Sequence, residues 1–216
     1  NLVDGSRSDL TSLRFCYSAG EALPIELHER WMRSFGVDIY DGIGSAEMFH
    51  IYITNRPGDV KAGSLGRIVN GYEAKIVDAE GTKVAVGEMG TLKIKGDSAA
   101  LCYWNAHEKS KETFAGDWCT TGDQFHVDEN GYYWYHGRTD EMLKVSGVFV
   151  APAEIENCLL KHEAVLECAV VGHESEGLIK PKGFVVLREG YSASGRLAEE
   201  IKQFVKASIA VYKYPR

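Results

Sequence analysis

The sequence changes character at Gly137–Gly147, and this change limits the possible folds more than any other pattern in the chain. Before it, β-rich segments alternate with glycine turns; after it, the pattern predicts one helix, two strands and a second helix. A domain boundary normally falls in a polar linker. This one concentrates charge, because Arg138, Asp140, Glu141 and Lys144 lie within seven residues. A charged loop between domains is the simplest interpretation, but the surrounding residues favour a functional one.

The composition is that of an ordinary globular protein. Of 216 residues, 44% are hydrophobic and 25% are charged, which excludes wholesale disorder. The net charge is -7 without a Lys/Arg cluster, so we expect no nucleic acid and no anionic membrane surface as a partner. We also expect no membrane span and no signal peptide. The five cysteines lack metal-type pairing, which favours reduced core thiols in a cytoplasmic protein.

The two ends of the sequence suggest a fragment. Position 1 is Asn1 instead of an initiator methionine, and Tyr212–Arg216 resembles the middle of a segment. We therefore expect the chain to be a piece of a longer protein.

The first forty residues predict a strand–helix–strand unit. Strands are expected at Leu13–Tyr17 and Val37–Tyr40, and the helix between them begins near Pro24 and ends at Gly36. The two strands of such a unit are parallel, and ligands bind at their carboxyl ends. The helix carries one apolar stripe with a spacing of four: Leu23, Leu27, Trp31 and Phe35.

Both predicted strands are followed by small and acidic residues. Ser18–Glu21 follows the first strand and Asp41–Glu47 follows the second. Small residues let backbone amides approach a ligand closely, and the Glu47 carboxylate is suited to a Mg²⁺ that accompanies phosphates. The alternative is that Gly42 and Gly44 only shape a turn and that Glu47 is solvated. This stretch by itself does not decide between the two.

Residues Lys61–His136 alternate with period two between turns, which predicts antiparallel strands in a small barrel or sandwich. The clearest strands are Tyr72–Val77, Thr91–Lys95 and Tyr132–His136. A short helix is expected near Ala106–Phe114.

Trp118–Asp123 is interpreted as the end of a further strand. An aspartate after a glycine at a strand end can accept hydrogen bonds from two vicinal hydroxyls, at roughly 1.5–3 kcal/mol each. The alternative is that Asp123 caps a turn, as Gly-Asp pairs usually do.

The region after the charged stretch predicts a small α+β domain. Its elements are a helix at Pro152–His162, strands at Leu166–Val171 and Gly183–Leu187, and a helix at Arg196–Ile209.

Five short motifs, taken in order, resemble the adenylate-forming superfamily of acyl- and aryl-CoA synthetases, luciferases and peptide-synthetase adenylation domains. The resemblance covers essentially the whole chain. The sequence Asp41–Ser45 followed by Glu47–Ile51 looks most like the benzoate-CoA ligase branch. The five motifs are Ser18–Glu21, Gly42–Glu47, Gly87–Leu92, Thr121–Asp123 and Gly137–Asp140.

The resemblance implies a fold class: α/β and β-barrel portions of a large N-terminal domain, followed by a small α+β C-terminal domain. Residues 1–60 would end the α/β subdomain, 61–139 would form a small antiparallel β-barrel subdomain, and 140–216 would be a truncated C-terminal lid.

The resemblance also implies a reaction with ATP, Mg²⁺ and CoA. A carboxylate attacks the ATP α-phosphate to give acyl-AMP and pyrophosphate, and the CoA thiol then displaces AMP. Glu47 would bind Mg²⁺, Asp123 the ribose hydroxyls and Arg138 the ribose–phosphate region. The residues implied around the adenine are Gly20, Glu21, Asp41, Gly42 and Ile43.

Further implied roles concern the second step and the acid. Asp140 would be the hinge about which the lid rotates between half-reactions. Lys144 and the backbone of Ser146 and Gly147 would face the active site near the CoA pantetheine. His50 and Ile51 would line an aryl pocket.

Two departures from the family pattern matter. Ala46 replaces the usual threonine, whose hydroxyl contacts the α-phosphate, and Ser45 would point elsewhere. The upstream phosphate loop is absent from the sequence, as is the lysine expected shortly after Arg216. The chain alone is therefore expected to be inactive.

Two other functions stay open at this stage. A carrier-protein adenylation domain would pass the acyl group to a phosphopantetheinyl protein instead of CoA. A non-catalytic nucleotide-binding module would turn over no ATP, and Ala46 would then reflect lost chemistry. A homo-oligomer is compatible with either, and the sequence does not name the acid.

Overall fold

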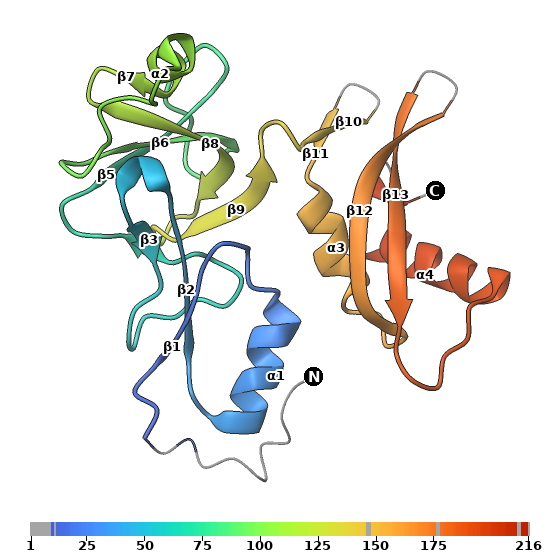
Figure 1. Ribbon diagram of the computed structural model, residues 1–216. Coiled ribbons are helices and arrows are strands. Elements are labelled where there is room, and N and C mark those ends of the chain that lie inside the picture. The colour runs from blue at the N-terminus through green and yellow to red at the C-terminus, as the bar shows by residue number, and fades with distance from the viewer. Residues whose placement is uncertain (1–9, 11, 146–147, 176–177, 211–212, 216) are drawn as a thin grey trace. The chain divides into compact units, whose positions relative to one another are not determined.

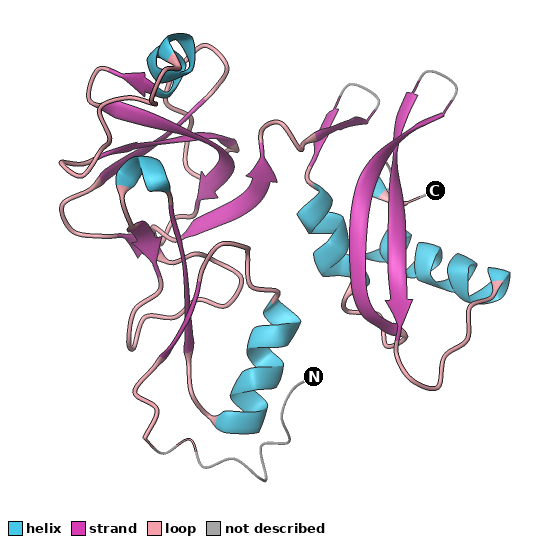
Figure 2. Cartoon of the chain, in the orientation of Figure 1, coloured by secondary structure: helices cyan, strands magenta, loops and turns pink. Residues whose placement is uncertain are grey.

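Two separate hydrophobic cores divide the chain into unit 1, Asn1–Tyr135, and unit 2, His136–Arg216. The computed structural model describes residues 10, 12–145, 148–175, 178–210 and 213–215 (Figures 1 and 2). The finer division into three parts at residues 60 and 139 stays a prediction.

Unit 1 begins with a strand–helix–strand arrangement. β1 (Cys16–Ser18) pairs in parallel with β2 (Ile39–Gly44), and α1 (Ile25–Phe35) connects them. Gly36 ends the helix in the left-handed conformation, φ 66°, and its N–H donates to the Met32 carbonyl oxygen at 2.9 Å. Only glycine adopts this conformation without steric cost. The predicted parallel unit is confirmed, although its first strand is shorter than expected.

The glycine-rich stretch after Tyr40 is not the predicted loop, because it continues β2. β3 (Ile51–Thr54) and then β4 (Arg67–Ile68) extend the sheet in the order β1-β2-β3-β4. A Cβ on Gly42 would lie 2.8 Å from a carbonyl oxygen of β3, and one on Gly44 only 2.3 Å from the carbonyl oxygen preceding β3. These glycines are therefore required by close strand packing instead of by a turn.

The other sheet of unit 1 has five strands, paired in the order β5-β6-β8-β7 with β9 also on β8. Within the described residues this pairing forms an open half-barrel. The expected short helix is α2 (His107–Thr113). The strands are β5 (Glu73–Val77), β6 (Gly90–Lys95), β7 (Phe114–Ala115), β8 (Trp118–Val127) and β9 (Tyr133–Arg138).

β8 corrects a second prediction. The strand does not end at Asp123 but runs on to Val127. Its register against β6 shifts in this region, since Thr91 pairs with Gln124 and Lys93 with Thr120. The extra residues on β8 form a bulge, a feature that bends a strand and re-aims its side chains.

One core joins the two sheets of unit 1. Residues from β3 and the 3₁₀ helix η2 (Ala46–Met48) pack against residues from β5, β6 and β8. The fully buried side chains include Tyr52 and Phe125. Burial of large apolar side chains is the main stabilising term here, at roughly 1.5–3 kcal/mol for each.

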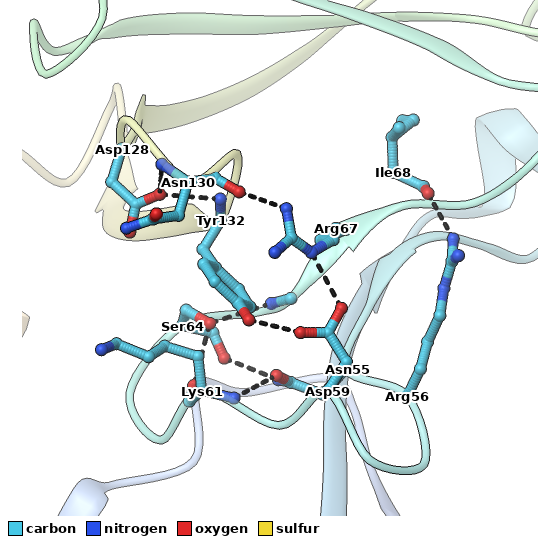
Figure 3. A network of polar contacts seen from close by, with 11 residues as sticks. Asn55, Arg56, Asp59, Lys61, Ser64, Arg67, Ile68, Asp128, Asn130 and Tyr132 are labelled. Atoms are coloured by element: carbon cyan, nitrogen blue, oxygen red, sulfur yellow. Dashed lines mark hydrogen bonds and ion pairs between the residues drawn. The ribbon is translucent and has the colours of Figure 1, made fainter.

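A polar network closes the long connection between β3 and β4 (Figure 3). Asn55 is 4% exposed, and its amide donates to the carbonyl oxygens of Asp41 at 3.2 Å and Ser64 at 2.8 Å. Its Oδ1 accepts the Lys61 N–H at 2.9 Å. The loop therefore has an internal side-chain anchor that also holds it to β2.

We expect Asn55→Ala to lower the free energy of unfolding by at least about 2 kcal/mol. The substitution removes three hydrogen bonds, at about 0.5–1.5 kcal/mol each, and leaves the carbonyl oxygen of buried Ser64 without its Asn55 donor. The midpoint of urea unfolding of the full-length protein measures the loss. Asn130→Ala is the control, because the contacts of Asn130 in Figure 3 come from its backbone. Equal midpoints for the two variants would contradict this interpretation.

Unit 2 is a small α+β unit with a layer of two helices on a two-stranded sheet. β12 and β13 pair antiparallel, with Ala169 opposite Phe184. The buried face of this sheet contributes Val165 and Val170 to a core shared with both helices. The elements are β10 (Leu143–Val145), β11 (Val148–Val150), α3 (Pro152–Leu159), β12 (Val165–Ser175), β13 (Leu178–Leu187) and α4 (Gly195–Ser208).

Unit 2 confirms the predicted helix–strand–strand–helix order and corrects its details. The first helix ends at Leu159 instead of His162, and both long strands extend beyond their predicted bounds. The antiparallel pair β10–β11 lies where the sequence predicts only a charged loop. None of the helices in the described part of the chain is long and apolar enough to cross a membrane.

Candidate active site

The carboxyl end of β1 lies beside the middle of β2, and these two segments carry the first candidate residues. Ser18 of β1 pairs with Asp41 of β2, so the loop that follows β1 starts at the predicted ligand edge. A hollow of about 510 Å³ is lined by residues 18–24 and Leu27. Gly20 lies in this loop with φ 98°, and the space around a Cβ there is empty. Gly20 and Glu21 are both exposed.

Asp41 holds this loop in place. Its side chain is buried, and its Oδ2 accepts the Leu23 N–H at 3.0 Å while its Oδ1 accepts the Gly42 N–H at 3.1 Å. Burial raises the pKa of Asp41, and the two N–H donors oppose that shift. Ile43, next along β2, is half-buried and packs against the core of unit 1. The structure thus places Asp41, with Gly42 and Ile43 after it in β2, beside the loop that carries Gly20 and Glu21.

Glu47 lies in η2, directly after β2. The Tyr103 hydroxyl donates a hydrogen bond to its Oε1 at 2.5 Å. This bond is the main reason why the pKa of Glu47 is lowered, because it stabilises the ionised carboxylate. Glu47 is therefore a half-buried, negatively charged carboxylate at neutral pH, whose oxygens can act as metal ligands. Its neighbour Ala46 is exposed.

Asp123 lies at the β8 bulge, after Gly122 with φ 78°. Its N–H donates to Thr121 Oγ1 at 3.2 Å, and that hydroxyl donates to the Leu92 carbonyl oxygen at 3.1 Å. The Asp123 side chain is 7% exposed. Burial raises the pKa of Tyr52 in the core of unit 1, and the charge of Asp123 adds a smaller rise. The bulge needs a residue with positive φ, and Gly122 provides it. The Gly-Asp pair is therefore explained by the bulge and not by a turn.

His50 lies between η2 and β3, and Ile51 is the first residue of β3. His50 is exposed and its N–H donates to the Met48 carbonyl oxygen at 2.9 Å, whereas Ile51 is half-buried at the start of β3. Phe49, which belongs to the same motif but has no predicted role, is 83% exposed with φ 70°. An exposed aromatic in the left-handed region is uncommon, and here it adjoins the residues predicted to bind an aryl group.

The remaining candidates lie in unit 2. Arg138 Nε is 3.2 Å from Asp140 Oδ1, so the structure brings these two together as an exposed ion pair. Lys144 is an exposed residue of β10, with its ammonium 5.9 Å from the centre of the Phe149 ring on β11. Ser146 and Gly147 lie outside the described residues.

Tyr103 is the site residue that sequence reasoning missed. It follows β6, and its hydroxyl reaches a carboxylate that lies 56 residues earlier in the chain. No local pattern signals such a contact. The only hint in the sequence is a tyrosine and a tryptophan adjacent to each other in a stretch that does not alternate.

Comparison with known families matches both parts of the chain. A family model described as AMP-binding enzyme matches residues 2–104, and one described as AMP-binding enzyme C-terminal domain matches residues 154–216. Together the two models account for most of the sequence.

Curated relatives include two benzoate ligases. The benzoate–CoA ligase of Thauera aromatica is 52% identical over 94% of this chain, and the 4-hydroxybenzoate–CoA/benzoate–CoA ligase of Rhodopseudomonas palustris is 46% identical over 94%. The chain spans 39% and 38% of the length of these two relatives.

Solved structures of two aryl-CoA ligases are also similar to this chain. A benzoate CoA ligase from Burkholderia xenovorans LB400 superposes with a TM-score of 0.92 at 50% identity, covering 100% of this chain and 43% of that one. The anthranilate CoA ligase AuaEII, solved with anthranoyl-AMP, gives 0.91 at 50% identity, covering 98% of this chain and 40% of that one. These enzymes share its α/β fold, and the chain belongs to the family of AMP-binding enzymes.

Proposed function

We propose that the full-length protein is an AMP-forming ligase that joins an aromatic carboxylic acid to CoA. The observation that carries the proposal is the 52% identity to a benzoate–CoA ligase over 94% of the chain. In the first step the carboxylate oxygen attacks the ATP α-phosphorus and pyrophosphate leaves. In the second step the CoA thiolate attacks the acyl carbonyl carbon and AMP leaves.

Most of the nucleotide contacts are assigned to residues of unit 1. Gly20 and Glu21 would border the adenine together with the β2 residues Gly42 and Ile43, because this loop is open and its backbone is accessible. Asp41 would act through the loop, since both of its carboxylate oxygens already accept backbone N–H groups. Asp123 would accept hydrogen bonds from the ribose hydroxyls, and Arg138 would bind near the ribose and phosphate.

Glu47 fits the Mg²⁺ that accompanies ATP in this chemistry. Mg²⁺ is bound by one or two carboxylates plus substrate phosphates and water, and Glu47 supplies one ionised carboxylate. In the part of the chain that the structure describes, no three His, Cys, Asp or Glu side chains are grouped so that they could hold a metal ion by themselves. The ion, when bound, would neutralise charge that develops on the phosphates.

Unit 2 is assigned to the second step. Residues 1–60 and 61–139 would belong to the large N-terminal domain, and 140–216 to a lid that turns about Asp140. Lys144, with the backbone of Ser146 and Gly147, would then meet the acyl-adenylate near the CoA pantetheine. The exposed position of Lys144 on a short hairpin supports a role in reaching a substrate.

The acid would bind beside β3, with His50 and Ile51 as part of an aryl pocket. Ala46 offers no hydroxyl for the α-phosphate, so that contact would come from elsewhere in the protein. The cytoplasmic location and the homo-oligomer stay predictions.

A panel of carboxylic acids tests the function. Full-length protein is incubated with ATP, Mg²⁺ and each acid, with and without CoA, and AMP release is measured. We expect sustained release only with CoA and faster release with aromatic than with short aliphatic acids. Release that needs a carrier protein instead of CoA would identify an adenylation domain, and no release with any acid would leave a nucleotide-binding module.

A further inference from the structure

Tyr103 differs from its neighbours in the segment that follows β6. Leu101 and Trp104 on either side are 95% and 96% exposed, so the segment lies on the surface of unit 1. Tyr103 is turned inward and half-buried, and its hydroxyl donates to Glu47 Oε1 at 2.5 Å. Charge-assisted O–H···O bonds of this length are the strong ones.

The tyrosine is held from several sides. Its N–H donates to Ser110 Oγ at 2.9 Å, and the same hydroxyl donates to the Ala106 carbonyl oxygen at 2.8 Å, which ties Tyr103 to the start of α2. Its ring lies 5.5 Å from the Phe114 ring and 4.5 Å from the Lys109 ammonium. Because the side chain is already fixed in this way, it loses little further conformational entropy when its hydroxyl donates a hydrogen bond.

The backbone around Glu47 is fixed by the same segment. The Ala100 N–H donates to the Glu47 carbonyl oxygen at 2.7 Å, and Ser98 Oγ donates to the Met48 carbonyl oxygen at 2.8 Å. Glu47 is thus held at its main chain and at Oε1 by residues of one connection. With Oε1 fixed, rotation of the carboxylate about its last torsion is restricted, and so is the direction of Oε2.

We propose that Tyr103 is a positioning residue that orients the Glu47 carboxylate toward the divalent ion bound with ATP. The inference rests on the proposed function, because that function assigns the ion to Glu47. Outer-shell hydrogen bonds of this kind orient metal-binding carboxylates, and their loss lowers metal affinity by roughly 10–100-fold. Tyr103 itself touches neither the ion nor the substrate.

The test uses Tyr103→Phe in the full-length protein, with Mn²⁺ as a paramagnetic probe of the divalent-ion site. Binding of Mn²⁺ in the presence of ATP is measured by electron paramagnetic resonance, without any turnover. We expect the affinity to fall by about tenfold. Tyr191→Phe is the matched control, since its hydroxyl also bonds a carboxylate, that of Glu163 in unit 2. The control should keep the wild-type affinity.

A double-mutant cycle separates positioning from general packing. In a Glu47→Gln background, Tyr103→Phe should change Mn²⁺ affinity by less than about threefold, because the group it orients is no longer charged. If Tyr103→Phe fails to fold, Ser110→Ala takes its place, since it loosens Tyr103 without altering its ring.

The outcomes exclude one another. The inference is supported if Tyr103→Phe lowers Mn²⁺ affinity by about threefold or more and this loss disappears in the Glu47→Gln background. A smaller fall, or one that persists in that background, overturns it. Failure of the proposed function would appear differently, as wild-type protein that makes no acyl-AMP from any acid.

Discussion

Replacing Asp140 by proline is expected to slow one half-reaction on the order of 100-fold more than the other, the scale of losing a group that acts only in one transition state. A hinge residue absorbs a large change in φ and ψ when a domain turns. Proline fixes φ near about -65° and would hold the lid in one orientation. Single-turnover rates of acyl-AMP formation and of CoA transfer in the full-length protein, measured separately, give the result.

Asp140→Ala is the control for this experiment. It removes the 3.2 Å contact with Arg138 but leaves the backbone free to turn. The exposed ion pair is worth little by itself, at most about 1 kcal/mol, so both half-reactions should survive. Equal losses of both steps in the proline variant, with the fold intact, would show that the lid does not turn at this residue.

Replacing Lys144 by alanine is expected to lower the rate of CoA transfer on the order of 100-fold and to spare acyl-AMP formation. A cation that meets the active site only after adenylation would stabilise the acyl-adenylate or the departing AMP during attack by the thiolate. Interactions made in one transition state affect that step alone. Single-turnover rates again resolve the two steps.

Lys182→Ala provides a matched control. Lys182 is also an exposed strand lysine of unit 2, with its ammonium 5.3 Å from the Phe184 ring, as Lys144 is 5.9 Å from the Phe149 ring. Loss of this control lysine should leave both rates close to wild type. An unchanged transfer rate in Lys144→Ala, or a loss confined to adenylation, would contradict the assignment.

Local patterns predicted the parts of the fold that local physics determines. The stripe that ends at Phe35 and the glycine after it describe α1, and alternation describes β5 and β6. The continuation of β2 through Gly42 and Gly44 was missed because glycine is a poor strand former. There the requirement is tertiary, since a neighbouring strand leaves no room for a Cβ.

Short elements and distant contacts explain the other differences. β10 and β11 have three residues each, too few for a periodic pattern to show. The motifs located Glu47, but its partner Tyr103 comes from another sheet connection and depends on how two sheets share one core. The structure likewise showed that the Asp41 carboxylate accepts the backbone N–H groups of Leu23 and Gly42, which no motif reveals.

The most direct test of the account is the fate of a carboxylate oxygen. Full-length protein is given benzoate labelled with oxygen-18 in its carboxylate, together with ATP, Mg²⁺ and CoA, and the nucleotide product is analysed by mass spectrometry. Attack of the carboxylate on the α-phosphorus, followed by thiolysis, predicts benzoyl-CoA and AMP that carries one labelled oxygen. Unlabelled AMP, or the formation of ADP together with labelled inorganic phosphate, would contradict an acyl-adenylate route.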